Sequence, residues 1–451
     1  MAGPGSTSCG DAAYPVSIVG LRCCIKGKRD MIEIQTVGSV DVSVAVPGSK
    51  SLTQRALIAA ALAEGESTLH GPLVSEDTEY SSAALRQVGV TIDHEESWRV
   101  QGNAGRIAPC AEPIFLGNNG TATRFLTSVL SLGNSRFVLD GDKRMAERPI
   151  EPLMTALQGW GVDVSSMHDT GCPPLVINST GLAGGMTVLP EGKSSQYLSS
   201  LLLVAPYARE VAELRVEGEV FSKPYITMTL DVMSRFGIHV EYSSDYKYFK
   251  IPRGIYRGQD YSVEGDASSA SYFWAAAAVT GGRVRVENVS VSSLQGDVKL
   301  VPLLGRMGCG LSIEGGGITL ASTGMLEGIS VDMADMPDVV PTLAVVAAFA
   351  EGKTHIQNIG HLRIKECDRL HAVVTELTRM GAEVEEHSDS MVIHGKGGRD
   401  LHGATIETYD DHRMAMSMAV AGLKVPGVEI SGEGCVAKSF PDFWQRFALL
   451  K

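Results

Sequence analysis

Five segments of the chain share one pattern of apolar and polar residues, in which an amphipathic helix ends at an apolar residue, a glycine and a new strand. The intervals between successive glycines are 72, 76, 71 and 73 residues. A glycine suits the left-handed backbone conformation that ends a helix before a strand. The five glycines are Gly89, Gly161, Gly237, Gly308 and Gly381. The stretch 440–447 has the form of a sixth copy, so the pattern predicts a structural repeat of about seventy residues.

A second set of helices is apolar nearly all round, which is typical of helices inside a core rather than on its surface. Small or polar residues open each of these helices, at 49–51, 118–121, 194–196, 266–269, 337–338 and 410–413. Each unit therefore reads strand, buried helix, strand, amphipathic helix and two strands. Six units predict an α/β fold of two similar domains, each of three βαβαββ units with buried helices and outer sheets.

Length, charge and cysteine spacing narrow the class of protein. The chain has 451 residues, of which 44% are hydrophobic, and this length favours more than one domain. The net charge of −13 argues against a general nucleic-acid binder. No apolar run approaches the roughly 20 residues that a membrane helix needs. The eight cysteines form no CxxC pair, which favours a reduced, cytoplasmic location over a disulfide scaffold.

Residues 1–30 differ from the rest, because they are rich in Gly and Ser at first and then in Lys and Arg. The regular pattern begins with the strand at Met31. We predict that 1–30 is an N-terminal extension, disordered or foreign to the fold, that takes no part in the chemistry.

The stretch 47–55 has the features of an anion-binding helix entrance. It follows an alternating strand, and its glycine and two serines can turn the chain and cap the helix. Lys50 lies at the positive end of that helix, while Ser51 and Arg55 share one helical face. Cations at a helix N-terminus repel its dipole unless an anion joins them, so the stretch predicts an anion site. The alternative is an ordinary capped helix with solvated charges.

Further basic residues cluster near other helix starts, at Arg124, Arg144, Arg148, Lys365, Arg369, Arg413 and Lys438. The acids suited to proton transfer are Asp338, which could instead be a helix N-cap, and Glu366, which nearby cations keep ionised unless burial raises its pKa. His412 could exchange a proton or be purely structural. The sequence has no Walker loop, G-x-S-x-G motif, zinc-ligand spacing or dinucleotide fingerprint.

Seven of these motifs, in this order, resemble the 5-enolpyruvylshikimate-3-phosphate synthase family. The resemblance runs from about Val40 to Phe443. It is carried by PGSKSLTQR at 47–55, LGNNGTATR at 116–124, RMAERPI at 144–150, SSQ at 194–196, GDASSA at 265–270, KECDR at 365–369 and DHRMAM at 411–416.

The resemblance implies one domain of 31–48 plus 264–451 and another of 49–263, with the active site in the cleft between them. It implies transfer of the enolpyruvyl group of phosphoenolpyruvate to the 5-hydroxyl of shikimate 3-phosphate, through a tetrahedral intermediate and with release of phosphate. No metal and no cofactor is implied. We expect a cytoplasmic monomer whose partners are these two substrates, not nucleic acid or a membrane.

The resemblance also assigns residues. Phosphoenolpyruvate would be held by Lys50, Gly120, Arg144, Gln196, Arg369, Arg413 and Lys438. Shikimate 3-phosphate would be held by Lys50, Ser51, Arg55, Ser194, Ser195, Gln196, Ser222, Tyr225, Asp338, His361 and Lys365. Asp338 would act as base on the attacking hydroxyl, Glu366 would protonate the methylene carbon, and Lys50 would move a proton or steady the leaving phosphate.

One departure and three rivals accompany this interpretation. His361 stands where better-known members of the family carry an asparagine. The nearest rival is the enolpyruvyl transferase that acts on UDP-N-acetylglucosamine, which uses a loop cysteine; residues 140–148 contain none. The others are a catalytically inactive anion-binding relative and an RNA-end cyclase on a kindred repeat. Loss of catalysis predicts a broken acid–base set, whereas Lys50, Asp338 and Glu366 are all present.

Overall fold

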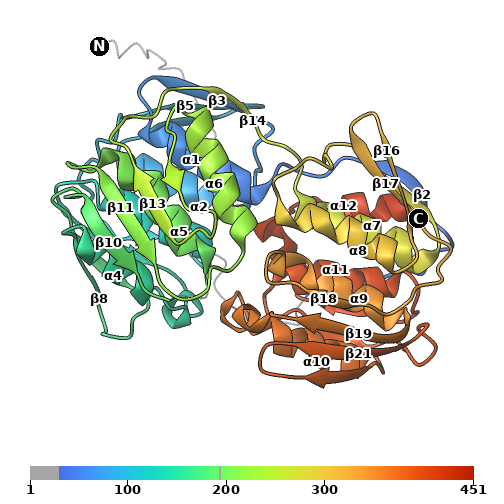
Figure 1. Cartoon of the computed structure of the whole chain (residues 1–451). Helices are drawn as coiled ribbons and strands as arrows, with labels where there is room; N and C mark the ends of the chain where they lie inside the picture. Colours follow the sequence, from blue (N-terminus) through green and yellow to red (C-terminus); the bar gives the residue numbers. More distant parts are fainter. Residues whose placement is uncertain (1–29, 192–193) are drawn as a thin grey trace, which may run out of the picture.

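Two lobes make up the protein, as Figure 1 shows for this computed structural model. The structure describes residues 30–191 and 194–451, so the predicted extension lies outside the described residues, apart from Asp30. One hydrophobic core, that of the N-lobe, takes its residues from 52–263. The other core, that of the C-lobe, takes its residues from 34–46 and 267–450. In the described residues, no helix is both long and apolar enough to span a bilayer.

Six nearly fully buried helices form the inner layer of the lobes. They are α1 (Lys50–Leu62), α3 (Gly120–Leu130) and α5 (Ser195–Val204) in the N-lobe, and α7 (Ala267–Thr280), α9 (Val340–Ala348) and α11 (His412–Gly422) in the C-lobe. All 14 residues of α7 are buried, as its uniformly apolar sequence predicts. Within the C-lobe, α9 packs against both α7 and α11.

Polar side chains cap five of these six helices. Each cap accepts a hydrogen bond from a backbone N–H two or three residues further on, which satisfies a donor that the helix leaves unpaired. The capping residues are Ser49, Asn119, Ser194, Asp266 and Asp411. Helix α9 differs, because the 3-10 turn η4 (Pro337–Val339) precedes it and its N-cap residue, Val339, has no side-chain cap.

The sheets cover the buried helices on the outside, and five of them have four strands. The three sheets of the N-lobe are β14 (Asp260–Ser262), β3 (Glu66–His70), β5 (Trp98–Gln101), β4 (Thr91–His94); β6 (Ile114–Phe115), β7 (Arg136–Asp140), β9 (Leu175–Asn178), β8 (Asp163–Ser166); and β10 (Gly185–Leu189), β11 (Ala212–Val216), β13 (Tyr248–Ile251), β12 (Glu241–Tyr242). In each, the first pair is parallel and the other two are antiparallel.

The C-lobe repeats this pairing pattern. Its sheets are β2 (Asp41–Val44), β15 (Arg283–Val286), β17 (Gly317–Ala321), β16 (Gly310–Glu314); β18 (Ser330–Asp332), β19 (Glu351–Gln357), β21 (Met391–Lys396), β20 (Glu383–Glu386); and β22 (Thr405–Glu407), β23 (Glu429–Ser431), β1 (Met31–Glu33). In the last sheet β1, from the start of the fold, supplies the antiparallel strand. The predicted α/β class with repeated units and outer sheets is therefore confirmed.

Amphipathic helices complete the units. They are α2 (Glu76–Gln87), α4 (Glu151–Gly159), α6 (Lys223–Arg235), α8 (Leu300–Arg306) and α10 (Arg369–Arg379), followed by the short α12 (Phe443–Phe447) in the sixth unit. The five glycines after α2, α4, α6, α8 and α10 have φ angles from 82° to 112°. The left-handed conformation predicted for them is confirmed.

The chain passes between the lobes at two points that lie side by side. Gly48 and Gly265 form an antiparallel bridge. The N–H of Ser49 donates to the carbonyl of Glu264 at 2.8 Å, and the N–H of Asp266 donates to the carbonyl of Pro47 at 2.8 Å. These bonds fix the N-terminus of α1 against the start of α7.

Replacing Gly48 by alanine tests how tightly this crossing is packed. A Cβ atom there would collide with the carbonyl oxygen of Gly71, which is backbone and cannot move aside cheaply. We expect Gly48→Ala to lower the free energy of unfolding by about 1–3 kcal/mol in urea titrations. Gly38→Ala is the control, because a Cβ atom there meets nothing within 4 Å. Equal stability of the two variants would contradict the prediction.

Candidate active site

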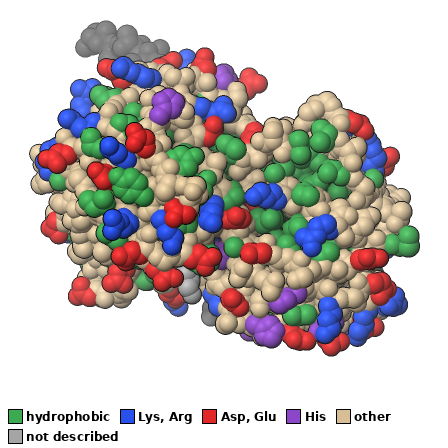
Figure 2. All heavy atoms as spheres, in the orientation of Figure 1, with side chains coloured by type: hydrophobic (Ala, Val, Ile, Leu, Met, Phe, Trp, Pro, Cys, Tyr) green, Lys and Arg blue, Asp and Glu red, His purple; other side chains and the backbone are tan. Residues whose placement is uncertain are grey.

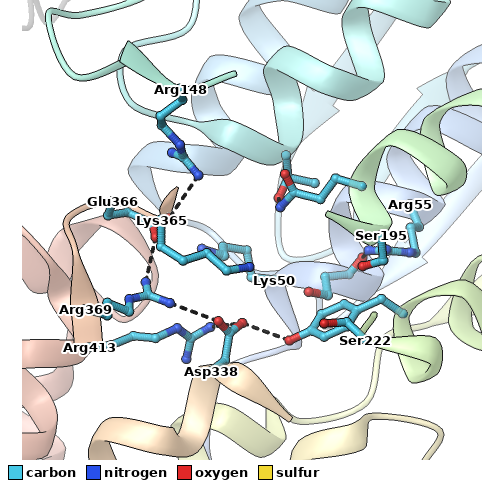
Figure 3. Close-up of a pocket in the computed structure, with 14 residues that line it drawn as sticks. Lys50, Arg55, Arg148, Ser195, Ser222, Asp338, Lys365, Glu366, Arg369 and Arg413 are labelled. Carbon is cyan, nitrogen blue, oxygen red and sulfur yellow. Dashed lines mark hydrogen bonds and ion pairs between the residues drawn. The ribbon is translucent and has the colours of Figure 1, made fainter. Parts of the chain in front are cut away.

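A pocket lies between the lobes and encloses about 540 Å³ of space that protein atoms do not fill. Figure 3 shows its lining. The N-lobe contributes Lys50, Ser51, Arg55, Thr121, Arg148, Ser195, Gln196, Ser222 and Tyr225, and the C-lobe contributes Asp338, Lys365, Glu366, Arg369 and Arg413. Six of these side chains are cations and two are carboxylates. The lining therefore suits a ligand with several negative charges.

The first turn of α1 forms one wall of the pocket. Lys50 is its first residue, and its backbone N–H donates to Asp266 Oδ2 at 3.1 Å. Arg55 is buried, and it donates from Nε to Thr229 Oγ1 at 2.8 Å and from Nη1 to the carbonyl of Ser51 at 2.9 Å. Burial lowers the pKa of Arg55 to about 10, which keeps it charged at neutral pH. Of the two interpretations of this stretch, solvated surface charges are ruled out for Arg55.

The loop after β7 brings a second cation, Arg148, into the pocket. Its Nη1 donates to Asn118 Oδ1 at 2.9 Å, and its Nη2 lies 3.9 Å from Glu366 Oε1. A Cβ atom at Gly120 would collide with this guanidinium, so the glycine allows Arg148 to lie against the start of α3. Buried Arg124 supports the loop from behind by donating to the carbonyl of Pro149 at 2.9 Å. Sequence reasoning did not assign Arg148 or Thr121 to the site.

Arg144, which the resemblance assigned to phosphoenolpyruvate, does not line the pocket. Its guanidinium donates to the backbone carbonyls of Lys365 at 3.0 Å and Glu366 at 3.1 Å. The 3-10 turn η1 (Met145–Glu147) separates Arg144 from Arg148 and turns the two side chains in different directions. Four positions along a loop thus do not place residues on one face, as they would in an α-helix.

Helix α5 brings two predicted residues into the lining and keeps a third behind it. Gln196 donates from Nε2 to Thr121 Oγ1 at 3.0 Å, and Ser195 lies beside it at the pocket. Ser194 instead accepts from the N–H of Gln196 at 3.3 Å as the helix cap. It lines a neighbouring hollow with Leu198.

Asp338 lies at the centre of an ion-pair cluster and does not cap α9. Its Oδ1 accepts from Arg369 Nη1 at 3.0 Å, and its Oδ2 accepts from Arg413 Nη2 and from the Tyr225 hydroxyl, each at 2.8 Å. Burial alone would raise the pKa of Asp338, but Arg413 and Arg369 hold that pKa well below its usual value. The carboxylate is therefore ionised and faces the pocket.

Glu366 and Lys365 form the opposite wall. Glu366 Oε2 accepts from Arg369 Nη2 at 2.7 Å. Burial opposes ionisation of Glu366, yet Arg369 and Arg148 hold its pKa well below the ordinary range. Burial lowers the pKa of Lys365. In the ligand-free pocket, Glu366 is thus a carboxylate.

Three further predicted residues lie outside the lining. Gly120 lies behind Arg148. Lys438 donates to the carbonyl of Asn118 at 2.8 Å and pairs with Asp77 at 3.3 Å. His361 is buried, with its ring centroid 5.5 Å from that of Phe221.

The arrangement combines charge binding with one fixed proton acceptor. Four arginines and two lysines can pair with phosphate and carboxylate oxygens, and Asp338 can accept a proton from a hydroxyl group placed beside it. Within the described part of the chain, no three His, Cys, Asp or Glu side chains are grouped as metal ligands.

Known proteins provide the family. The family model described as EPSP synthase (3-phosphoshikimate 1-carboxyvinyltransferase) matches residues 34–447. The chain is similar to the 3-phosphoshikimate 1-carboxyvinyltransferases of Nostoc punctiforme, with 45% identity over 93% of this chain and 98% of the relative, and of Methanothermobacter thermautotrophicus, with 41% identity over 92% and 97%. A solved EPSP synthase structure from Acinetobacter baumannii superposes with a TM-score of 0.77 at 28% identity, covering 93% of this chain and 98% of that one.

His412, beside the pocket, provides a test of the site's electrostatics. Burial, followed by Lys50 and Arg413, holds the pKa of His412 well below 6.5. The unfolded chain then binds a proton that the folded chain excludes, so stability falls as the pH drops below 6.5. We expect His412→Asn to remove about 1.4 kcal/mol per pH unit from this slope in urea unfolding.

The control for this measurement is His239→Asn, because His239 is exposed. The control should retain the wild-type slope. A His412→Asn protein whose stability falls with pH as steeply as the wild type would show that His412 is protonated in the folded state.

Proposed function

Because the chain belongs to the EPSP synthase family, we propose that the cationic pocket between its lobes is the active site of a 3-phosphoshikimate 1-carboxyvinyltransferase. The enzyme transfers the enolpyruvyl group of phosphoenolpyruvate to the 5-hydroxyl of shikimate 3-phosphate and releases phosphate. This reaction belongs to the shikimate pathway of aromatic amino acid biosynthesis. The nucleotide-sugar and inactive alternatives are not favoured, since relatives at 41% and 45% identity carry this enzyme's name.

The observation that carries the proposal is the charge of the lining. The two substrates together bear two phosphates and two carboxylates, and the pocket presents six cations drawn from both lobes. Such a set binds oxyanions by paired N–H donors and stabilises negative charge without reorganisation.

The phosphoenolpyruvate subsite lies where the C-lobe arginines meet Lys50. We assign it to Lys50, Gln196, Arg369 and Arg413 in the lining, with Arg148 in place of Arg144, the backbone at Gly120, and Lys438 from behind. Support comes from the ion pairs of Arg369 and Arg413 with Asp338, because an incoming carboxylate can share these guanidinium groups.

The shikimate 3-phosphate subsite lies toward α5 and α6. We assign it to Lys50, Ser51, Arg55, Ser195, Gln196, Ser222, Tyr225, Asp338 and Lys365 in the lining. Ser194 and His361, which lie outside the lining, would support it indirectly. Serine hydroxyls and one buried arginine suit a phosphate monoester, while the Tyr225 ring offers an apolar face to a six-membered ring.

The reaction then needs one base and one acid. Asp338 takes the proton of the 5-hydroxyl as its oxygen bonds to the central carbon of phosphoenolpyruvate, and Glu366 gives a proton to the methylene carbon. Loss of phosphate and of a proton from the new methyl group restores the enol double bond. Two bound polyanions offset the cations that hold the pKa of Glu366 down, so substrate binding favours its protonated form.

Every residue of the pocket comes from one chain, so a monomer suffices for activity, and we propose that state. We also propose that the two lobes are the domains 31–48 plus 264–451 and 49–263. The cytoplasmic location stays a prediction from the cysteine spacing.

Asp338→Asn tests the assigned base. Asparagine keeps the shape of the side chain but cannot take the hydroxyl proton, so we expect kcat to fall by a factor of order 10² or more while shikimate 3-phosphate still binds. Phosphate release and ligand-induced fluorescence measure the two quantities. The control, Asp332→Asn, changes an exposed residue outside the pocket. A turnover equal to that of the control would remove Asp338 from its role.

Substrate choice tests the function itself. Phosphate release is measured with phosphoenolpyruvate plus shikimate 3-phosphate, and separately with phosphoenolpyruvate plus UDP-N-acetylglucosamine. We expect release only in the first mixture, because the site offers a subsite for a phosphate monoester. Release only in the second mixture would overturn the proposal.

A further inference from the structure

We propose that Arg144 is a positioning residue that fixes, from the N-lobe, the C-lobe segment carrying Lys365 and Glu366. These two side chains would then take their places in the pocket only when the lobes are together. The inference rests on the proposed function, in which Glu366 protonates the methylene carbon and Lys365 holds shikimate 3-phosphate.

The contacts of Arg144 use three nitrogens of its guanidinium. Nε donates to the carbonyl of Glu366 at 3.1 Å and Nη2 to the carbonyl of Lys365 at 3.0 Å. Nη1 donates to Glu147 Oε2 at 3.0 Å within the same loop. Two adjacent backbone carbonyls on one lobe are therefore held by one rigid fork anchored on the other lobe.

The segment that Arg144 holds is not part of regular structure. The 3-10 turn η5 (Gly360–Ile364) ends before Lys365, and α10 begins at Arg369. The carbonyl of Asp368 is the first to join the helix, accepting from the N–H of Ala372 at 2.9 Å. The carbonyls of Lys365 and Glu366 precede this ladder, so their position depends on donors from outside the helix.

The restraints within the C-lobe act on side chains instead. Arg369 binds the carboxylate of Glu366 at 2.7 Å, and Arg363 pairs with Asp368 at 2.9 Å. These bonds stay within one lobe and do not depend on the distance between lobes. Arg144 adds the restraint that does, because it sets where this backbone lies relative to the N-lobe wall of the pocket.

Figure 3 shows the consequence for the site. Lys365 and Glu366 lie beside each other on the C-lobe wall, and Arg148 of the N-lobe approaches Glu366 from the opposite side. The same loop thus supplies Arg148 to the pocket and Arg144 to the backbone behind it. Losing the fork of Arg144 should misplace the proton donor while leaving the N-lobe subsite for shikimate 3-phosphate in place.

Two variants of Arg144 separate hydrogen bonding from charge. Arg144→Lys keeps the charge but cannot hold two carbonyls with one fork, and Arg144→Gln removes both. We expect each to lower kcat/KM for phosphoenolpyruvate by about tenfold or more, because each lost charge-assisted bond is worth at least that factor. The dissociation constant for shikimate 3-phosphate alone should change by less than about twofold.

Lys143→Gln is the matched control. It removes the same charge one position earlier, from an exposed side chain, and should keep wild-type kinetics. A loss in Lys143→Gln equal to that in Arg144→Gln would assign the effect to the field of the loop, and wild-type kinetics in both Arg144 variants would assign no role to the fork. Either result overturns the inference.

Backbone hydrogen exchange gives a readout that tracks the segment itself. With both substrates bound, amides within 363–370 should exchange faster in Arg144→Gln than in the wild type, while amides of β21 stay unchanged. Equal exchange in the segment would also overturn the inference. The wild-type protein separates the two proposals, because absence of phosphate release by the wild type refutes the proposed function, whereas an active wild type leaves the variants to test Arg144 alone.

Discussion

Mutual repulsion among six cations in one pocket is the constraint on which the rest of the site depends. Two like charges about 4 Å apart repel by about 4 kcal/mol at an effective dielectric constant of about 20, so each cation needs a partner before a substrate arrives. Asp338 serves Arg369 and Arg413, and Glu366 serves Arg369 and approaches Arg148. The two acids of the proposed chemistry are therefore also the counterions that make the empty pocket stable.

The same pairing explains why the site lies between the lobes. Figure 2 shows both signs of charge interspersed over the visible face of this acidic protein, so the cationic character is local to the pocket. Several polar contacts there join opposite lobes: Tyr225 donates to Asp338, Arg144 to the carbonyl of Glu366, and Lys438 to the carbonyl of Asn118. Neither lobe alone holds the full charge set, because the partners come from different units of the repeat.

The repeat supplies the scaffold for this convergence. Each unit buries one helix and caps it with a polar residue, so the starts of several buried helices can carry functional side chains on rigid supports. Lys50 opens α1, Thr121 and Gln196 lie in the first turns of α3 and α5, and Arg413 lies in the first turn of α11. Unit four departs from this use, because α7 contributes no lining residue.

The sequence by itself determined the repeat, the buried helices, their caps and the left-handed glycines, because these follow from local periodicity and backbone sterics. It also identified most of the lining, since a residue in the first turn of a helix has a fixed direction. Only the tertiary structure decided between Arg144 and Arg148, placed Ser194 and His361 behind the wall, and made Asp338 an ion-pair centre rather than a helix cap. Those residues lie in loops, 3-10 turns or at caps, where sequence spacing does not set direction and contacts with distant units do.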